Sequence, residues 1–252
     1  MVIDGRTRTC GLIGNPVEHT LSPLIQNALA NEAGINAVYV PLGVKDGLKK
    51  AIEGAYTFGF AGMNVTVPYK RDVLELLSGV DDAAGRIGAV NTLKYTDKGY
   101  YGYNTDVTGF VREMEELGLS VAGEDVIVLG AGGASLAVCE GLRQLYVDHI
   151  YMLNRSLDKA RQLYGDCSDI TLLGLDEYDK IPDGGYTCIQ CTSVGLPDSA
   201  DRAAIEDEGF YSRIKAGVDL IYNPSETAFM KRVTFQYPFN YQKDTFAYSI
   251  LF

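Results

Sequence analysis

The segment Asn64–Lys70 places three kinds of polar side chain within seven residues. Asn64 supplies an amide, Thr66 a hydroxyl and Lys70 an amine. Asn64 and Thr66 are two residues apart, so on a strand their side chains point to the same face. Pro68 is tolerated where a strand ends, which puts Lys70 in the following turn or first helical residues. Such a strand end suits a small hydroxylated or carboxylated ligand, and an amine with a lowered pKa can also transfer a proton. The alternative is a polar strand end with a solvated lysine.

A second stretch has the order of a nucleotide-binding turn. The apolar strand Val126–Leu129 runs into a glycine-rich loop that opens a helical stretch. Glycines allow a tight turn and close approach of the backbone to a pyrophosphate, and a helix N-terminus offers free N–H groups. Ser135 departs from the strict G-x-G-x-x-G pattern, but the strand–loop–helix context favours a dinucleotide site over a plain βα turn. The candidate cofactor contacts are Gly130, Ala131, Gly132, Gly133 and Ala134.

The residues after the next apolar strand, Ile150–Leu153, indicate which dinucleotide is bound. They are Asn154, Arg155 and Ser156, with Lys159 close behind. An NAD site carries an acidic residue at this position to bind the ribose 2′-hydroxyl. Here the position is an asparagine, and the guanidinium of Arg155 can hold a 2′-phosphate or stack on adenine. The segment therefore predicts NADP rather than NAD.

Composition restricts the classes of function. The chain has 252 residues, 46% of them hydrophobic, and a net charge of −11, which argues against a nucleic-acid partner. The longest apolar runs are too short to span a membrane, and the first residues have no apolar signal core, so we expect a cytoplasmic protein. Five cysteines at irregular spacing fit a reducing compartment. Cys188 and Cys191 form a C-x-x-C pattern on an expected strand, where they point to opposite faces, so we predict no metal site.

The elements that must position these residues alternate between strand and helix. Strands are expected at 9–13, 38–42, 62–68, 93–95, 126–129, 150–153 and 186–193. Helices are expected at 22–33, 46–56, from 73, at 107–117 and at 136–145. Strands separated by helices imply βαβ units and a mostly parallel sheet. The helix at 107–117 has the place of a linker between two halves.

The order of motifs along the chain resembles the shikimate dehydrogenase family from about Cys10 to Met230. Each motif alone is weak, whereas eight in this order are specific. The motifs are Gly14-Asn-Pro-Val-Glu-His-Thr20-Leu-Ser22-Pro, Asn64–Lys70, Gly88-Ala-Val-Asn91-Thr92, Asn104-Thr105-Asp106, Gly130-Ala-Gly-Gly-Ala134, Asn154-Arg155-Ser156, Cys191-Thr-Ser-Val-Gly195 and Asp219-Leu-Ile-Tyr222-Asn-Pro224.

The resemblance implies an α/β fold of two domains. Residues 1–105 would form a mostly parallel α/β substrate domain, 106–228 a Rossmann-like NADP domain, and 229–252 an atypical tail that can return to the first domain. The implied activity is the reversible NADPH-dependent reduction of 3-dehydroshikimate to shikimate, in the route to chorismate and aromatic amino acids. Its partners would be this small substrate and NADP, without nucleic acid or membrane, in a monomer or homodimer.

The family's functional residues carry over onto matching positions of this chain. The resemblance makes Lys70 the acid–base residue, paired with Asp106. The substrate contacts would be Thr20, Ser22, Asn64, Thr66, Asn91 and Tyr222. Asn154, Arg155, Ser156 and Lys159 would join the glycine loop in binding NADP, with Asp82, Thr192 and Leu220 at further positions near the cofactor.

The C-terminal tail departs from the family. Relatives continue to a helix that packs on the first domain and supplies a glutamine to the substrate, whereas Val233–Phe252 is aromatic and has little helical periodicity. Gln242 is the candidate replacement, and loss of the closing helix would expose apolar surface of the first domain. Two alternatives stay open: a quinate/shikimate dehydrogenase that uses NAD, and a catalytically weak protein that binds shikimate or nucleotide.

Overall fold

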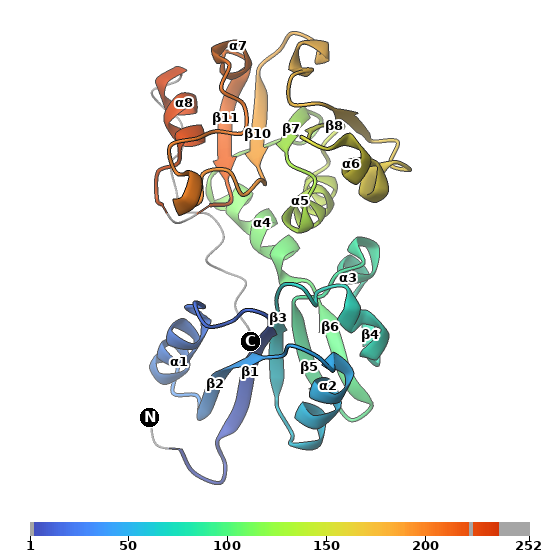
Figure 1. Ribbon diagram of the computed structural model, residues 1–252, viewed down its shortest axis with the longest axis vertical. Helices are drawn as coiled ribbons and strands as arrows, with labels where there is room; N and C mark the ends of the chain where they lie inside the picture. Colours follow the sequence, from blue (N-terminus) through green and yellow to red (C-terminus); the bar gives the residue numbers. More distant parts are fainter. Residues whose placement is uncertain (1–2, 222–223, 237–252) are drawn as a thin grey trace. The chain divides into compact units, whose positions relative to one another are not determined.

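The structure is a computed structural model that describes residues 3–221 and 224–236 (Figure 1). The side chains of 235 and 236 are not described. Two compact units divide the chain between Thr105 and Asp106, and each is described by itself. Within the described ranges, no helix combines the length and the apolar character needed to cross a membrane.

The first unit contains a mixed six-stranded sheet in the order β2-β1-β3-β5-β6-β4. The pairs β1/β2, β1/β3 and β4/β6 are parallel, whereas β3/β5 and β5/β6 are antiparallel. The strands are β1 (Arg8–Gly14), β2 (Ala37–Gly43), β3 (Gly62–Val65), β4 (Gly79–Val80), β5 (Thr92–Thr96) and β6 (Gly99–Tyr103). The helices are α1 (Ser22–Glu32), α2 (Leu48–Thr57), the 3₁₀ helix η1 (Asp72–Leu76) and α3 (Asp82–Ile87).

The two faces of this sheet are covered unequally. One face carries the main core, in which Met63, Leu93 and Tyr100 pack against α2, η1 and α3. The other face has a smaller cluster of Leu12, Val17 and Tyr39, and α1 contains no buried residue. A groove of about 620 Å³ lies on this side between α1 and the strands.

The second unit contains a five-stranded, fully parallel sheet in the order β11-β10-β7-β8-β9. Its first strand, β7, is central, so the direction of winding reverses between β7 and β10. The strands are β7 (Asp125–Leu129), β8 (His149–Leu153), β9 (Ile170–Leu173), β10 (Tyr186–Gln190) and β11 (Ile214–Asp219). The helices are α4 (Thr105–Glu116), α5 (Gly133–Gln144), α6 (Leu157–Tyr164), η2 (Tyr178–Lys180), η3 (Pro197–Ser199), α7 (Glu208–Tyr211) and α8 (Ala228–Gln236). This is the Rossmann-like, doubly wound arrangement.

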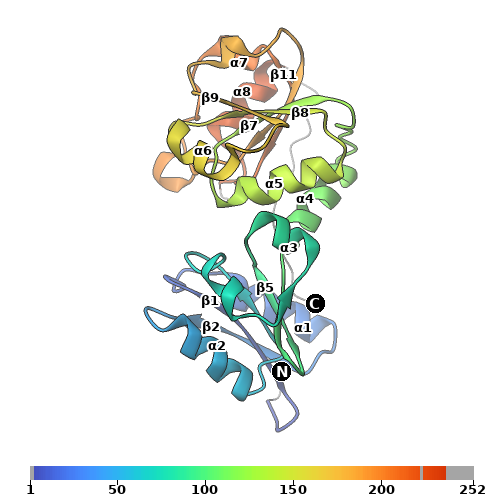
Figure 2. The same ribbon diagram turned by 90° about the vertical axis from the view of Figure 1, so that its right-hand side faces the viewer.

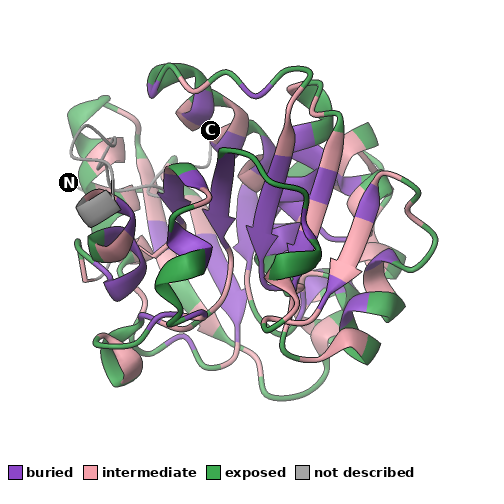
Figure 3. Ribbon diagram, turned by 90° about the horizontal axis from the view of Figure 1, so that it is seen from above, coloured by how far each residue is buried: buried purple, intermediate pink, exposed green. Residues whose placement is uncertain are grey.

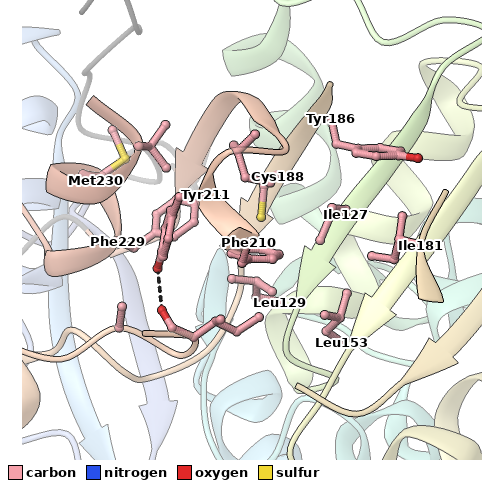
Figure 4. Close-up of a cluster of buried hydrophobic side chains, with 14 of the residues drawn as sticks. Ile127, Leu129, Leu153, Ile181, Tyr186, Cys188, Phe210, Tyr211, Phe229 and Met230 are labelled. Carbon is pink, nitrogen blue, oxygen red and sulfur yellow. Dashed lines mark hydrogen bonds between the residues drawn. The ribbon is translucent and has the colours of Figure 1, made fainter. Parts of the chain in front are cut away.

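Helices cover both faces of the parallel sheet. The strands are therefore mostly buried, whereas the outer helix faces are exposed (Figure 3). On one face Phe110, Met114 and Leu142 of α4 and α5 pack against the strands, and Figure 2 shows these two helices side by side. On the other face Phe210 and Phe229 of α7 and α8 join the cluster drawn in Figure 4. Burial on both faces explains why strands such as 126–129 are unbroken runs of apolar residues rather than alternating ones.

The α/β class with a Rossmann-like second sheet is confirmed, but element limits differ from those expected. Strand β3 ends at Val65, whereas the expected strand ran to Pro68. The first residues of the expected tail are helical: α8 runs from Ala228 to Gln236 and lies in the second unit. Phe229 and Val233, one helical turn apart, are buried there on the same helix face.

Two helical glycines, one in each unit, test how closely their helices pack against neighbouring side chains. A Cβ on Gly141 of α5 would lie 2.5 Å from Cδ1 of Phe110, whereas a Cβ on Gly54 of α2 would meet nothing within 4 Å. We expect Gly141→Ala to destabilise the protein by about 1–2 kcal/mol despite its better helix propensity, because overpacking costs more. Gly54→Ala is the matched control and should stabilise by about 0.5–1 kcal/mol. Thermal unfolding followed by circular dichroism measures both, and a stabilising Gly141→Ala would contradict the close helix contact.

Candidate active site

The first unit has a cavity of about 350 Å³ at the ends of its central parallel strands. Six residues chosen from the sequence line it: Thr20, Ser22, Asn64, Thr66, Lys70 and Asn91. The other lining residues are Leu12, Pro16, Val17, His19 and Val65. His19 was not singled out from the sequence, although it lies within the Gly14–Ser22 motif. The cavity therefore gathers hydroxyls, amides, an imidazole and one amine from three segments of the chain.

Pairing of β1 with β3 brings the first two segments together. The strands are parallel with Ile13 opposite Val65, so their carboxyl ends lie at one edge of the sheet. Beyond that point the chain stays paired, because Thr66 N donates to Ile13 O at 2.9 Å and Asn15 N donates to Val67 O at 3.0 Å. A Cβ on Gly14 would collide with the methyl group of Thr66. Glycine at this position thus lets the Thr66 side chain lie directly over the β1 backbone.

Two hydroxyls meet at the N-terminus of α1. Thr20 Oγ1 lies 3.1 Å from Ser22 Oγ and accepts the Ser22 N–H at 3.2 Å. The helix begins at Ser22 with Leu21 at the N-cap, one residue earlier than a Ser22 cap would give, and Leu21 offers no side-chain oxygen. The N-cap residue itself therefore makes no side-chain hydrogen bond to the first turn of the helix. Hydroxyl donors beside a helix N-terminus favour an anion such as a carboxylate.

Buried polar side chains connect the strands that support the cavity. Tyr39 donates its hydroxyl to Asn64 Oδ1 at 2.7 Å, and Asn64 Nδ2 donates to Asn91 O and Thr92 Oγ1 at 3.3 Å each. Asn91 in turn accepts the Thr105 N–H at 2.9 Å and donates from Nδ2 to Thr105 Oγ1 at 3.0 Å. Asn64 is thereby oriented from both sides. Tyr39 was missed from the sequence, because its proximity to Asn64 depends on the strand order.

Lys70 and Asp106 belong to different parts of the chain. Lys70 is half-buried in the turn before η1, where its backbone oxygen accepts the Val90 N–H at 2.7 Å. Asp106 lies in the first turn of α4, where a negative charge is favourable. Thr105, which the Asn91 side chain holds, ends the first unit, and Asp106 begins the second. The pairing of Lys70 with Asp106 stays a prediction.

The glycine loop of the second unit forms an open cradle at the end of β7. Gly130 has a positive φ of 97°, and a Cβ there would lie 2.7 Å from Thr192 Cγ2. A Cβ on Gly132 or Gly133 would meet nothing within 4 Å, and no side chain caps α5. Ser135 is fully buried and donates to Gly132 O at 2.7 Å, which explains a serine where the strict pattern has glycine. Free N–H groups above open space fit the phosphates of a dinucleotide.

Side chains at the strand ends hold the neighbouring loops. Asn154 accepts the Ala131 N–H at 3.1 Å and donates to Ser156 O at 2.8 Å. Gln190, fully buried, accepts the Thr192 N–H at 2.5 Å and donates to Val194 O at 3.0 Å. Both amide ends of Asn154 are thus engaged within the protein, so it supports the cradle whether or not it also touches a cofactor.

A cavity of about 440 Å³ beside the cradle contains carboxylates that local sequence reasoning did not anticipate. Arg155 lines it together with Asp176 and Glu177 from the loop after β9. Lys180 donates to Glu177 at 2.5 Å and Gly174 N donates at 2.7 Å, and these bonds lower the pKa of Glu177. The prediction of NADP from the sequence rested on the residues that directly follow β8. Strand pairing of β8 with β9 brings the acidic loop alongside.

The remaining candidate residues are dispersed or not described. Lys159 is exposed on α6, and Asp82 lies in the first turn of α3 in the first unit, outside both cavities. Thr192 lies against Gly130, and Leu220 N donates to Gln190 O at 3.2 Å in the adjacent loop. Tyr222 and Gln242 lie outside the described residues.

The second unit has a doubly wound sheet with an open glycine cradle, and the first unit has a polar cavity that contains a lysine. Together they define a dinucleotide-dependent α/β oxidoreductase. A family model for the shikimate dehydrogenase substrate binding domain matches residues 12–93. The NADP(+) shikimate dehydrogenase of Caldanaerobacter subterraneus is 39% identical over 92% of this chain and 84% of its own length. This chain belongs to the shikimate dehydrogenase family.

Solved structures agree with this assignment. A shikimate dehydrogenase in complex with NADP+ is 34% identical and superimposes with a TM-score of 0.83, covering 93% of this chain and 83% of the other. The shikimate 5-dehydrogenase of Listeria monocytogenes, in complex with shikimate and NAD, is 26% identical with a TM-score of 0.83 and covers 93% and 85%.

Alanine substitutions at Gly130 and Gly132 should have different effects on the stability of the fold and on dinucleotide affinity. We expect Gly132→Ala to cost less than about 1 kcal/mol of stability, because its Cβ is unobstructed. The same Cβ occupies the cradle, so dinucleotide Kd should rise at least about 10-fold. Gly130→Ala should instead destabilise the fold by about 1–3 kcal/mol, owing to its positive φ and its contact with Thr192. Calorimetric titration and thermal melting measure these effects, and unchanged affinity in Gly132→Ala would remove the cradle from the site.

Proposed function

We propose that this protein is an NADP-dependent shikimate dehydrogenase, which reversibly reduces 3-dehydroshikimate to shikimate in the route to aromatic amino acids. The observation that carries this conclusion is the single cavity in which Lys70 lies with five neutral hydrogen-bonding residues. The family relationship supplies the reaction, and the open glycine cradle supplies a place for the dinucleotide.

The cavity can bind a ring that carries a carboxylate and several hydroxyls. Its volume of about 350 Å³ is at the small end for ligand sites. Thr20 and Ser22, beside the N-terminus of α1, would donate to the carboxylate. Asn64, Thr66 and Asn91 would bond the ring hydroxyls. Because Asn64 and Asn91 are held by Tyr39 and Thr105, little side-chain entropy is lost on binding.

Lys70 is the group that would exchange a proton with the substrate. Bound NADPH supplies a hydride to the ring ketone. As an ammonium, Lys70 would stabilise the oxygen that becomes negative and then protonate it, and in the reverse direction the amine would accept the proton. Asp106 as a carboxylate would favour the charged form of Lys70 and orient it. Tyr222 and Gln242 remain proposed substrate contacts.

Cofactor preference would follow from the charges around Arg155. A guanidinium binds a 2′-phosphate by charge-assisted hydrogen bonds, which favours NADP. Asp176 and Glu177 line the same cavity and favour a ribose 2′-hydroxyl over a phosphate, which supports a second candidate function with NAD and a quinate-type substrate. Lys180 partly neutralises Glu177, which leaves Asp176 as the main opposing charge. We therefore propose NADP as the preferred cofactor.

The test is a steady-state assay of the full chain with shikimate and quinate, each with NADP+ and NAD+. Turnover of about 1–10³ s⁻¹ with shikimate and NADP+ is expected. A higher kcat/KM with quinate and NAD+ would establish the second candidate. Binding of shikimate without turnover of any pair would establish a catalytically weak binding protein.

Removal of the Lys70 amine should abolish most of the chemistry while leaving binding of the neutral groups intact. We expect Lys70→Ala to lower kcat by about 10²–10⁴-fold, with a smaller change in the KM for shikimate. Lys50, exposed on α2, is the control, and Lys50→Ala should retain wild-type kinetics. A Lys70→Ala variant with full kcat would refute the assigned role.

The cavity lined by Arg155, Asp176 and Glu177 is the proposed adenosine site. Removal of its positive or its negative charge should change the cofactor preference in opposite directions. We expect Arg155→Ala to lower kcat/KM for NADP+ about 10–100-fold and to change that for NAD+ less than about 3-fold, because a charge-assisted hydrogen bond contributes about 1.5–3 kcal/mol. Asp176→Asn removes the opposing charge and should raise the NADP+/NAD+ ratio. Equal losses for both cofactors in Arg155→Ala would show that Arg155 does not recognise the 2′-phosphate.

A further inference from the structure

The groove between α1 and the sheet of the first unit is large enough to hold a small molecule. Its volume of about 620 Å³ exceeds that of the substrate cavity and is typical of a ligand site. One wall is apolar, with Leu29 and Ala30 from α1 and Ile35 from the connection to β2. All residues that line the groove belong to the first unit. The candidate substrate and cofactor residues that the structure describes are not among them.

Two cations lie along the floor of this groove. Arg8 and Cys10 are two residues apart on β1, so their side chains point to the same face of the sheet. Cys10 is opposite Gly62 of β3, and Gly62 is opposite Lys94 of β5. Lys94 is therefore in the same row of the sheet, roughly 10 Å from Cys10. Gly62 has no side chain to fill the space between them.

The charge of the groove differs from that of the whole chain. The residues that line it include both cations and no carboxylate, whereas the chain has a net charge of −11. Within the described residues, neither Arg8 nor Lys94 forms an ion pair. Burial raises the pKa of the Cys10 thiol and the charge of Arg8 opposes this shift, so the guanidinium acts on the groove floor. A cleft lined by one sign of charge attracts ligands of the opposite sign.

We propose that this groove is a second binding site of the protein, for a small carboxylate that carries an apolar body of about one ring. Arg8 and Lys94 would hold the carboxylate, and the body would lie against Leu29, Ala30 and Ile35. Burial of the apolar body would supply most of the affinity, and the two cations would select an anion over a neutral molecule. The site does not depend on the reaction that the protein catalyses.

A wall of paired side chains separates this groove from the substrate cavity. Tyr39 and Thr92 line the groove, whereas Asn64 and Asn91 line the substrate cavity. All four are buried. Tyr39 donates to Asn64 Oδ1 at 2.7 Å, and Thr92 donates to Asn91 Oδ1 at 2.9 Å. A ligand in the groove and a ligand in the substrate cavity therefore contact different sides of this wall, and both can be bound at once.

Calorimetric titration of the full chain with 3-phenylpropionate tests the site. At pH 8 we expect a Kd below about 1 mM. 3-Phenylpropanamide, which has the same shape and no charge, should bind at least about 5-fold more weakly, because charge-assisted hydrogen bonds are the stronger ones. Lys94→Gln should weaken binding of 3-phenylpropionate about 3-fold, as expected for an exposed cation. Lys98→Gln, exposed in the β5–β6 turn and outside the groove, is the matched control and should bind normally.

A pair of substitutions on α1 tests the apolar wall. Ala30 lines the groove, so the indole of Ala30→Trp should fill it and abolish binding of 3-phenylpropionate. Ala28 is exposed on the same helix and does not line the groove, so Ala28→Trp should leave the Kd unchanged. Circular dichroism spectra of the two variants that match that of the wild type would show that both are folded.

Alkylation of Cys10 reports where the probe binds. Cys10 is half-buried on the groove floor, so iodoacetamide should modify it in the free protein. At about five times its Kd, 3-phenylpropionate should slow this reaction at least about 5-fold, because few molecules then have an empty groove. Cys167, half-buried in the second unit, is the control and should keep its rate. Saturating shikimate should not displace the probe.

Three outcomes would overturn the proposal. The first is a lack of binding of 3-phenylpropionate at about 10 mM, or equal binding of its amide. The second is displacement of the probe by shikimate, which would assign the probe to the substrate cavity. The third is a Cys10 that resists alkylation in the free protein, which would show that another part of the chain or a second copy already covers the groove. A protein inactive with shikimate would contradict the proposed function and leave these results standing.

Discussion

Loops that leave the carboxyl ends of parallel strands carry N–H groups beyond the last ladder bond, and these groups need partners outside the sheet in both units. Backbone groups near a buried edge must be paired with something. In the second unit the side chains of Asn154, Gln190 and Asp219 accept one loop N–H each, at 3.1, 2.5 and 2.9 Å. The exception is the start of α5, directly after the glycine turn, where no side chain caps the helix. That difference marks where an anion belongs.

The first unit meets the same constraint with a chain of polar side chains rather than separate caps. Tyr39, Asn64, Asn91 and Thr105 come from β2, β3, the segment before β5 and the start of α4. Each orients the next, so the amides that face the cavity are preorganised. A neutral network of this kind favours a ligand of hydroxyls and a single carboxylate, and it leaves Lys70 as the proposed proton donor. Specificity here comes from hydrogen-bond geometry more than from net charge.

The two sites differ in how charge is distributed. The substrate cavity is lined by neutral groups around one lysine, although the whole chain carries a net charge of −11. The cavity beside Arg155 also contains two carboxylates, Asp176 and Glu177, and Lys180 pairs with the second. Preference for NADP is therefore a balance of opposing local charges rather than the result of a single arginine.

Much of the fold was predictable because its signals are local. Alternating apolar strands and helices indicated the α/β class, and the strand–glycine–helix order of Val126–Ser135 placed the dinucleotide turn. The motif at Asn64–Lys70 pointed to three residues that line the cavity of the first unit, Asn64, Thr66 and Lys70, because they follow one another at the end of a short strand. The sequence did not indicate helix α8, because Phe229 and Val233 are only two apolar residues one turn apart, and their burial depends on the sheet face that covers them.

What only the tertiary structure decided depends on strand order and register, which no local pattern encodes. Tyr39 of β2 reaches Asn64 of β3 because both strands pair with β1, one on each side. Asp176 and Glu177 line the same cavity as Arg155 because β9 pairs with β8. Asp219 accepts the Thr227 hydroxyl only because the folded chain brings Thr227 back to the end of β11. The sequence determined which chemical groups are present and at which strand ends. The folded chain decided which of them bind a ligand and which hold the loops, because burial and hydrogen-bond partners are properties of the packed molecule.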